Sequence, residues 1–546
     1  MNDYNLLDEE WIPVLHHNGT AQRVGILRAL EDADRIRQIA ASNPMDRVAV
    51  LRFLLALLYW CNEDTSVGVS ENAVDSFPSN WFATLSANKE CFDLLDSRRP
   101  FYQDLRLSDE FRKRAEEAVD KQTSRSKPKH SSDERSRRVQ EIIQGSFVAS
   151  TNLMHDLPSA TNIAHFRHIQ DERDGMCLPC CALGLIRWST AAPAGTAGAG
   201  QSMTAGINGV TPTYSVPTGA SLLATLLLAG PSAHAVQNDA PVWDGADEES
   251  PLGFLKGMTW RSRRVLLAPL DAYGKRSLSP GRCCHCGEQT DRLVKSILFR
   301  PGWTRPSTAP WADDPHLLRI TRKDGKSAKA KEKQIVPSWP SPNEPLEDHA
   351  GVWRAIMEGL LQRSTGSQTC ATEFHTTLLG TSQALYKHVG EHMAVLPGLP
   401  SGVAGSLLDE LKWLREVTWI TIAARGGNWR DPPKGQCIVG ALYAPRAKGY
   451  ALRSGLCARS FPVEHELEQA FQRLMQDLAT AGQSDREEIV RAWRAKACKI
   501  VRDYVEPSVD AAMSGSPLLR REARQCADEA ILEAVRQIDR RKGVSK

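Results

Sequence analysis

The sequence predicts an α+β protein in which a large mixed N-terminal domain with a zinc knuckle precedes a C-terminal four-helix bundle. Short strand and helix patterns alternate over the first part of the chain, which also contains two separated Cys-x-x-Cys pairs. From about residue 403, apolar residues follow helical spacing instead. We therefore expect a mixed α/β domain over 1–400 and a helical bundle over 401–546.

Length and charge restrict the class of protein. The chain has 546 residues, too many for one hydrophobic core. Its 68 Lys and Arg residues nearly balance 65 Asp and Glu residues, which argues against a histone-like polycation. The N-terminus has no signal-peptide pattern, and the apolar stretches at 48–60 and 220–230 are shorter than a membrane span. We expect a cytoplasmic protein without a membrane partner, and two buried helices at these stretches.

The N-terminal half offers several local signals. "EWIPVL" (10–15) predicts a strand, and residues 45–61 predict a helix with Asn43 as N-cap and Pro44 after it. Residues 121–138 hold seven basic and two acidic side chains and no apolar one, which is typical of a solvated loop or a disordered insertion. This basic segment is also a candidate for nucleic-acid contact.

Two later segments carry turn signals. Residues 191–213 are rich in Gly, Ala, Ser and Thr, so we expect a loop there. Residues 316–336 predict a hairpin, because the strand pattern "LLRIT" is followed by the turn signal Asp324-Gly325.

The C-terminal region has amphipathic helical patterns. Stripes at i, i+3, i+4 and i+7 occur in 467–478, 489–504 and 523–538, and 405–427 supplies a fourth candidate helix. Asp485 is the expected cap of the second of these stripes. We interpret Trp493 as a core residue, and the four helices as a bundle.

Two Cys-x-x-Cys pairs carry the strongest chemical signal, Cys177 with Cys180 and Cys283 with Cys286. Together they supply four thiolates for a structural, tetrahedral Zn²⁺. The wide separation of the pairs requires the fold to bring them together, and Cys181, Cys284 and His285 are spare ligands. A redox pair, a deaminase zinc site and plain buried thiols are the alternatives, although no βαβ pattern or His-x-Glu motif supports the first two.

Several motifs together resemble the large subunit (CasA) of the type I-E CRISPR surveillance complex, Cascade. In chain order they are "EWIPV" (10–14), "RPFYQD" (99–104), "SATNIAHF" (159–166), "CLPC" (177–180), "GAGQSMTAGINGVTPTYSV" (198–216), "CCHCG" (283–287) and "LLGTSQAL" (378–385). This resemblance implies a non-enzymatic subunit that works with the other Cascade subunits and the guide RNA. It would read the protospacer-adjacent motif (PAM) of double-stranded target DNA from the minor groove, open the duplex, and recruit the helicase–nuclease.

The resemblance also implies site residues. The two cysteine pairs would form the zinc knuckle, and Gly198, Ala199 and Gly200 would form a glycine loop in the minor groove. Gln383 and Ala384 would be the wedge that opens the duplex. A first nucleic-acid-facing loop would include Asn162, Phe166, Arg167 and His168. A basic side chain after the knuckle would reach the PAM, with Arg300 as first choice and Lys295 as second.

Two rival hypotheses belong to other classes of protein. A zinc-dependent nuclease or deaminase would need an open coordination position and a nearby general base. Four cysteines would close the site, and only Glu288 supplies a carboxylate beside a knuckle. A stand-alone zinc-ribbon protein would instead bind DNA without partner subunits or guide RNA.

Overall fold

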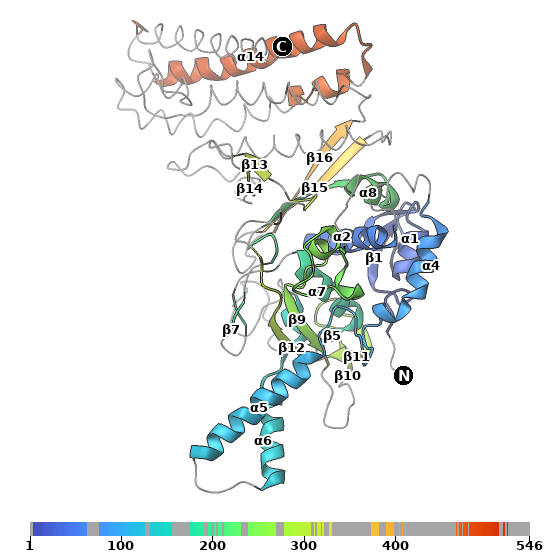
Figure 1. Cartoon of the computed structure of the whole chain (residues 1–546). Helices are drawn as coiled ribbons and strands as arrows, with labels where there is room; N and C mark the ends of the chain where they lie inside the picture. Colours follow the sequence, from blue (N-terminus) through green and yellow to red (C-terminus); the bar gives the residue numbers. More distant parts are fainter. Residues whose placement is uncertain are drawn as a thin grey trace. The chain divides into compact units, whose positions relative to one another are not determined.

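The computed structural model describes the chain in two compact units (Figure 1). The first comprises Met1–Leu317 with Leu378–Glu391, and the second comprises Leu318–Thr377 with His392–Lys546. The described residues cover most of 4–317 and parts of 319–521. Their gaps include 63–75, 126–130, 155–174, 231–237, 269–277, 330–372, 382–388 and most of 411–465, with shorter gaps elsewhere. The mixed helix-and-strand class is confirmed, whereas the boundary at residue 400 stays a prediction.

The first unit is built around a central apolar helix, α2 (Pro44–Cys61). Its N-cap is Asn43, whose side chain accepts a hydrogen bond from the Met45 amide at 2.8 Å. Almost every side chain of α2 is buried, since it packs against helices on several sides and against an N-terminal sheet. The predicted helix, cap and N-terminal strand are therefore confirmed.

Two small groups of elements flank α2. The N-terminal sheet contains β1 (Ile12–His16), β2 (Ala21–Val24) and β3 (Ile36–Ile39), in the spatial order β2-β1-β3. Helix α1 (Ile26–Glu31) lies between β2 and β3 along the chain. The helices around α2 are α4 (Ser79–Ala87), α7 (Leu178–Thr190), α8 (Leu222–Ala229) and α9 (Phe254–Met258). Helix α8 lies in the second apolar stretch, and most of its side chains are buried, as expected.

Two antiparallel sheets lie beyond α7. One has the order β10-β11-β5, from β5 (Met176–Cys177), β10 (Leu278–Arg282) and β11 (Gln289–Val294). The other has the order β4-β12-β9, from β4 (Val148–Ala149), β9 (Arg263–Leu267) and β12 (Ser296–Pro301). Because β11 and β12 are separated only by Lys295, the two sheets follow each other directly along the chain.

The basic segment 121–138 was expected to be a loop or a disordered insertion. This expectation was wrong for 121–125 and 132–138, which are helical, while 126–130 lie outside the described residues. Helix α5 (Arg106–Arg125) and helix α6 (Ser132–Gly145) form a helical pair that extends away from the other labelled elements of the first unit (Figure 1). Its apolar contact is made outside the basic segment or at its edge, by Ala115, Val119 and Val139. Ion pairs such as Arg135–Asp120 and Arg138–Glu134 lie along the helix surfaces. Charged residues therefore cover the surface of this helical pair, α5 and α6, which we call the helical arm.

The Gly-rich stretch 191–213 also contains regular structure that was not expected. Strands β6 (Gly195–Ala197) and β7 (Gln201–Met203) pair antiparallel, with Thr196 opposite Ser202. Backbone hydrogen bonds define this hairpin, so its small side chains give no alternating apolar pattern to detect. Farther along, β8 (Thr213–Thr218) belongs to a sheet of order β16-β15-β8, with β15 (Glu373–Thr381) and β16 (Val389–Pro397).

The described part of the second unit contains a hairpin and a long helix. Strands β13 (Arg319–Thr321) and β14 (Ser327–Lys329) pair antiparallel, as the predicted hairpin requires, while the expected turn at Asp324-Gly325 lies outside the described residues. Helix α14 (Arg486–Ala512) begins directly after Asp485. Trp493 on this helix is buried and contacts Phe471 edge-to-face at 5.8 Å, which confirms it as a core residue. The other bundle helices lie largely outside the described residues, so the four-helix bundle stays a prediction.

Candidate metal centre and nucleic-acid interface

The two Cys-x-x-Cys pairs meet in space. The sulfur atoms of Cys177, Cys180, Cys283 and Cys286 all lie within 4.8 Å of one another, and those of Cys177 and Cys286 are 3.6 Å apart. Tetrahedral Zn²⁺ with Zn–S bonds of about 2.3 Å places its sulfurs roughly 3.8 Å apart. The four thiols therefore fit the size of a four-thiolate metal site, and three of the four residues are buried.

Strand pairing brings the first cysteine pair to the second. Strand β5 pairs with β11, with Cys177 opposite Leu293, and Cys180 follows in the first turn of α7. Gly175 precedes β5 with φ +113°, and a Cβ there would lie 2.5 Å from the Val294 carbonyl oxygen. Only glycine allows β5 to approach β11 this closely.

The second cysteine pair lies in the turn between β10 and β11. Gly287 has φ +77°, and its amide donates to the Cys283 carbonyl at 2.9 Å, which closes the turn. The Cys177 amide donates to the Cys283 sulfur at 3.3 Å. A backbone amide that points at a sulfur favours the thiolate, which is the form that binds a metal.

The thiols influence each other's protonation. Hydrogen bonds from Cys177 and Cys180 lower the pKa of Cys283, and they hold the pKa of Cys286 at about 5. The pKa of Cys180 is raised, first by its hydrogen bond with Cys177 and then by those with Cys283 and Cys286. Four clustered thiols cannot all ionise without a cation, so a bound divalent ion would release the remaining protons.

The neighbours of the cluster separate ligands from spare residues. His285 Nδ1 is 3.3 Å from the Cys180 sulfur, while the Cys181 thiol donates to the Met176 carbonyl at 3.8 Å. Burial raises the pKa of Cys284 to about 12, and Cys284 is not a member of the cluster. The Glu288 carboxylate forms an ion pair with Arg23. The candidate ligand set is therefore the four cysteines of the two pairs, and Cys181, Cys284 and His285 are its neighbours.

Most of the predicted nucleic-acid residues lie outside the described part of the chain. They are Asn162, Phe166, Arg167, His168, Gly198, Ala199, Gly200, Gln383 and Ala384. The described strands nevertheless locate two of these segments along the chain. Residues 198–200 connect the paired strands β6 and β7, and 382–388 connect the neighbouring strands β15 and β16. Both segments therefore occupy connections between strands, as expected for loops.

The two candidate basic residues have different surroundings. Arg300 on β12 is 8% exposed, and its guanidinium lies 4.1 Å from the centre of the Phe111 ring. Burial, followed by the charge of Arg114, lowers its pKa. Lys295, between β11 and β12, is exposed and close in sequence to the cysteine turn.

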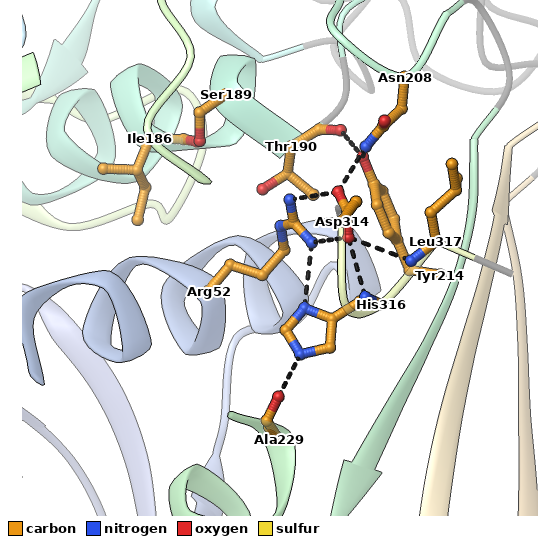
Figure 2. A network of polar contacts seen from close by, with 10 residues as sticks. All are labelled: Arg52, Ile186, Ser189, Thr190, Asn208, Tyr214, Ala229, Asp314, His316 and Leu317. Atoms are coloured by element: carbon orange, nitrogen blue, oxygen red, sulfur yellow. Dashed lines mark hydrogen bonds and ion pairs between the residues drawn. The ribbon is translucent and has the colours of Figure 1, made fainter. Parts of the chain in front are cut away.

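A buried polar network in the first unit was not anticipated (Figure 2). Arg52 of α2 is fully buried and forms a bidentate ion pair with Asp314, at 2.9 and 2.8 Å. Asn208 donates to Asp314 at 2.6 Å, and the Tyr214 hydroxyl donates to the Thr190 carbonyl at 2.6 Å. An arginine inside the otherwise apolar stretch 48–60 was the sequence signal, because a buried cation requires a partner.

The fold and the cysteine cluster define a class of protein: a mixed helix-and-strand protein in which four clustered cysteines could hold a metal ion. Among the described residues, no helix is both long and apolar enough to cross a membrane.

Comparison with known proteins narrows this class. The model of the family "CRISPR-associated protein Cse1" matches residues 5–375, and the chain therefore belongs to that family. The "CRISPR-associated protein CasA/Cse1" of Thermus thermophilus is 26% identical over 288 residues, 49% of each chain, so the alignment spans about half of that relative.

Solved structures agree over a greater length. The crystal structure of Thermus thermophilus CasA matches with a TM-score of 0.55 and 19% identity, covering 98% of this chain and all of that one. A chain of a structure titled "CRISPR RNA-guided surveillance complex" matches with a TM-score of 0.53 and 13% identity, covering 97% and 99%. At these identities the likeness establishes the fold.

Proposed function

We propose that this protein is the large subunit of a type I-E CRISPR RNA-guided surveillance complex. The observation that carries this proposal is membership of the Cse1 family over residues 5–375, together with a fold match to a chain from such a complex over nearly the whole length. Its partners would be the other complex subunits, the guide RNA, double-stranded target DNA and the helicase–nuclease. The complex would act in the cytoplasm, in defence against foreign DNA.

The proposed DNA reader is the glycine loop, Gly198 to Gly200. It connects β6 with β7, so it lies at the end of a narrow two-stranded hairpin. A loop without large side chains suits the narrow minor groove, where bulky residues would clash with the groove walls. Minor-groove readout is also degenerate, which suits a sensor that accepts several related motifs.

The proposed wedge is the pair Gln383 and Ala384, in the segment between β15 and β16. A connection of this length is too short for a parallel crossover, so the two neighbouring strands favour a hairpin. A side chain inserted between base steps unstacks DNA at a cost of a few kcal/mol per step. Strand exchange with guide RNA is nearly balanced in free energy, so such a wedge can decide whether exchange begins.

Between the two basic candidates, the surroundings favour Lys295 as the residue that contacts the PAM. Arg300 would have to leave its place over Phe111 to reach DNA, whereas Lys295 is already exposed. Asn162, Phe166, Arg167 and His168 remain the proposed first loop, which contacts PAM-side DNA or guide RNA. Arg167 would face a phosphate.

The proposed role of the cysteine cluster is structural, with Zn²⁺ as the metal. Four thiolates complete a tetrahedral site and leave no position for a substrate or a reactive water. Glu288, the carboxylate nearest to the turn, is paired with Arg23. We therefore propose binding and recruitment as the function, in preference to a zinc-dependent nuclease or deaminase. The zinc would fix the two ends of the segment that includes the glycine loop.

The wedge proposal has a direct test. In the assembled complex, Gln383→Ala should slow guide-RNA strand invasion on PAM-bearing duplex DNA while sparing a target that is already melted. The exposed residue Gln289 on β11 supplies the control Gln289→Ala, which should leave both substrates unaffected. Equal loss on duplex and pre-melted DNA would remove the wedge role from Gln383.

A further inference from the structure

The hairpin β6–β7 is short, and both of its strands lie close to β12. Its strands, Gly195–Ala197 and Gln201–Met203, are three residues each and mostly small. A two-stranded hairpin alone is marginally stable in water, because it buries too little apolar surface. A hairpin that must present a loop at a defined place therefore depends on contacts with the rest of the unit, along β12 and at its own base.

Backbone hydrogen bonds join the chain before β6 to the chain after β7 and close the turn that follows. Ala192 precedes β6, and its carbonyl accepts from the Gly206 amide at 3.0 Å. Gly209, with φ +83°, completes a turn in which its amide donates to the Gly206 carbonyl at 2.9 Å. A Cβ on Gly206 would lie 3.2 Å from the Ala192 Cβ, so this approach is close.

The same turn is attached to the buried network (Figure 2). Asn208 Nδ2 donates to Asp314 Oδ2 at 2.6 Å and to the Tyr214 hydroxyl at 3.2 Å. Tyr214 in turn donates to the carbonyl of Thr190, the last residue of α7. The Tyr214 hydroxyl and the Asn208 side-chain amide thus connect the end of α7, before the hairpin, with the turn that follows the hairpin.

The residues of the network are buried and belong to the first unit. Arg52 holds Asp314 with two hydrogen bonds and also donates to His316 Nδ1 at 3.0 Å. His316 Nε2 therefore donates to the Ala229 carbonyl, at 2.8 Å. Asp314 also accepts from the amides of His316 and Leu317. The hydrogen bonds that converge on Asp314 favour one local geometry.

We propose that the Arg52–Asp314 network, through Asn208 and Tyr214, positions the β6–β7 hairpin before DNA arrives. This role rests on the function proposed above for the loop at the hairpin's end. Arg52 and Asp314 act as positioning residues, since they reach the loop only through the turn at 206–209. Pre-organisation of this kind lowers the entropy that binding must overcome.

The first test is made on the protein alone. Tyr214→Phe keeps the ring that lies 4.7 Å from the Arg52 guanidinium and removes only the hydroxyl. Hydrogen exchange of the amides in 195–203 should become about three- to tenfold faster, as expected for the loss of a buried hydrogen bond. The control Thr225→Val removes a buried hydroxyl of α8, which donates to the Ser221 carbonyl and accepts from the Gly219 amide, and should leave exchange in 195–203 unchanged.

The second test uses the assembled complex. Tyr214→Phe and Asn208→Ala should reduce the preference for duplex with the PAM over duplex without it by about three- to tenfold. Thr225→Val should not, although all three lower the unfolding midpoint. Unchanged exchange and unchanged preference in both hairpin-base variants would overturn the proposal.

A loop variant separates this proposal from the function on which it rests. Ala199→Leu places a bulky side chain in the glycine loop itself. If Ala199→Leu abolishes the PAM preference while Tyr214→Phe and Asn208→Ala retain it, only the positioning role fails. If Ala199→Leu also retains the preference, the proposed function of the loop fails.

Discussion

At the scale of single residues, the cysteines illustrate what spacing alone leaves open. The motif identified two pairs, and the structure brings Cys177, Cys180, Cys283 and Cys286 within 4.8 Å while Cys181 and Cys284 remain outside. Neighbouring thiols in a sequence differ because a strand or a turn directs their side chains differently. The choice between adjacent cysteines therefore required the backbone path of β5 and of the turn before β11.

Cysteine substitution tests the metal site. Cys283→Ser should remove most of the bound zinc from a chain that otherwise carries about one ion, because a serine hydroxyl stays protonated and binds Zn²⁺ poorly. Metal content measured by mass spectrometry, with thermal unfolding, gives the readout. Cys284→Ser is the matched control and should retain the ion. Full zinc in Cys283→Ser, or its loss in Cys284→Ser alone, would contradict this ligand set.

Asp314 gives the first unit a defined pH dependence. Burial raises the pKa of Asp314, but the charge and hydrogen bonds of Arg52 outweigh burial and hold it at about 2. Since this pKa lies below the unfolded value of roughly 4, the contribution to stability is present above pH 4. It is lost as pH falls from about 4 to 2, and its size is about 2 kcal/mol.

The variant Asp314→Asn tests this contribution. It leaves the Arg52 charge buried without a carboxylate, so the free energy of unfolding at pH 7 should fall by about 3–5 kcal/mol. Denaturant unfolding at several pH values should also show a smaller decrease between pH 4 and pH 2 than in the parent protein. Asp109→Asn, at an exposed pair with Arg112, should change neither quantity. If Asp314→Asn lost as much stability between pH 4 and pH 2 as the unmodified protein, ionisation of Asp314 would not be the cause of that loss.

At the scale of elements, the sequence predicted those whose signals are local. Helix α2 has its cap and its apolar run, and β13 and β14 pair on either side of the sequence signal Asp324-Gly325. The segments 121–138 and 191–213 were misjudged because their stability comes from elsewhere. Arm helix α5 is supported by apolar residues before the basic segment, and β6–β7 by a network anchored on Arg52 and Asp314. Long-range contacts of this kind leave no periodic signal.

The helical arm should be separable from the rest of the first unit. Ala115, Val119 and Val139 form their own apolar cluster, whereas Leu107 and Phe111 pack on Leu266 and Leu298 of the β9–β12 sheet. Replacing residues 116–142 by a short Gly/Ser linker should therefore change the unfolding midpoint little and leave zinc content unchanged. Phe111→Ala, which removes packing at the arm's base, should cost about 3–5 kcal/mol.

Thermal unfolding and metal content check this expectation on the purified protein. A deletion that destabilises the protein as much as Phe111→Ala would mean that the arm is part of the core. Binding of DNA or guide RNA that is lost on deletion would instead assign the arm to the interface.

At the scale of the whole molecule, the cysteine cluster and the polar network act on the same stretch of chain. Helix α7 carries Cys180 in its first turn and Thr190 at its end, so it connects the cysteine cluster with the base of the hairpin. Arg187 of this helix also pairs with buried Asp46 of α2 at 2.6 Å. The proposed DNA-reading loop is thus flanked by contacts to the best-packed helices of the first unit.

The most direct test of the central claim is R-loop formation by the surveillance complex with and without this subunit. We predict that the guide-RNA complex opens PAM-bearing duplex DNA when the subunit is present. Without it, the same complex should pair only with pre-melted target. Equal opening of the duplex in both assemblies, or cleavage of DNA by the isolated subunit, would contradict the account.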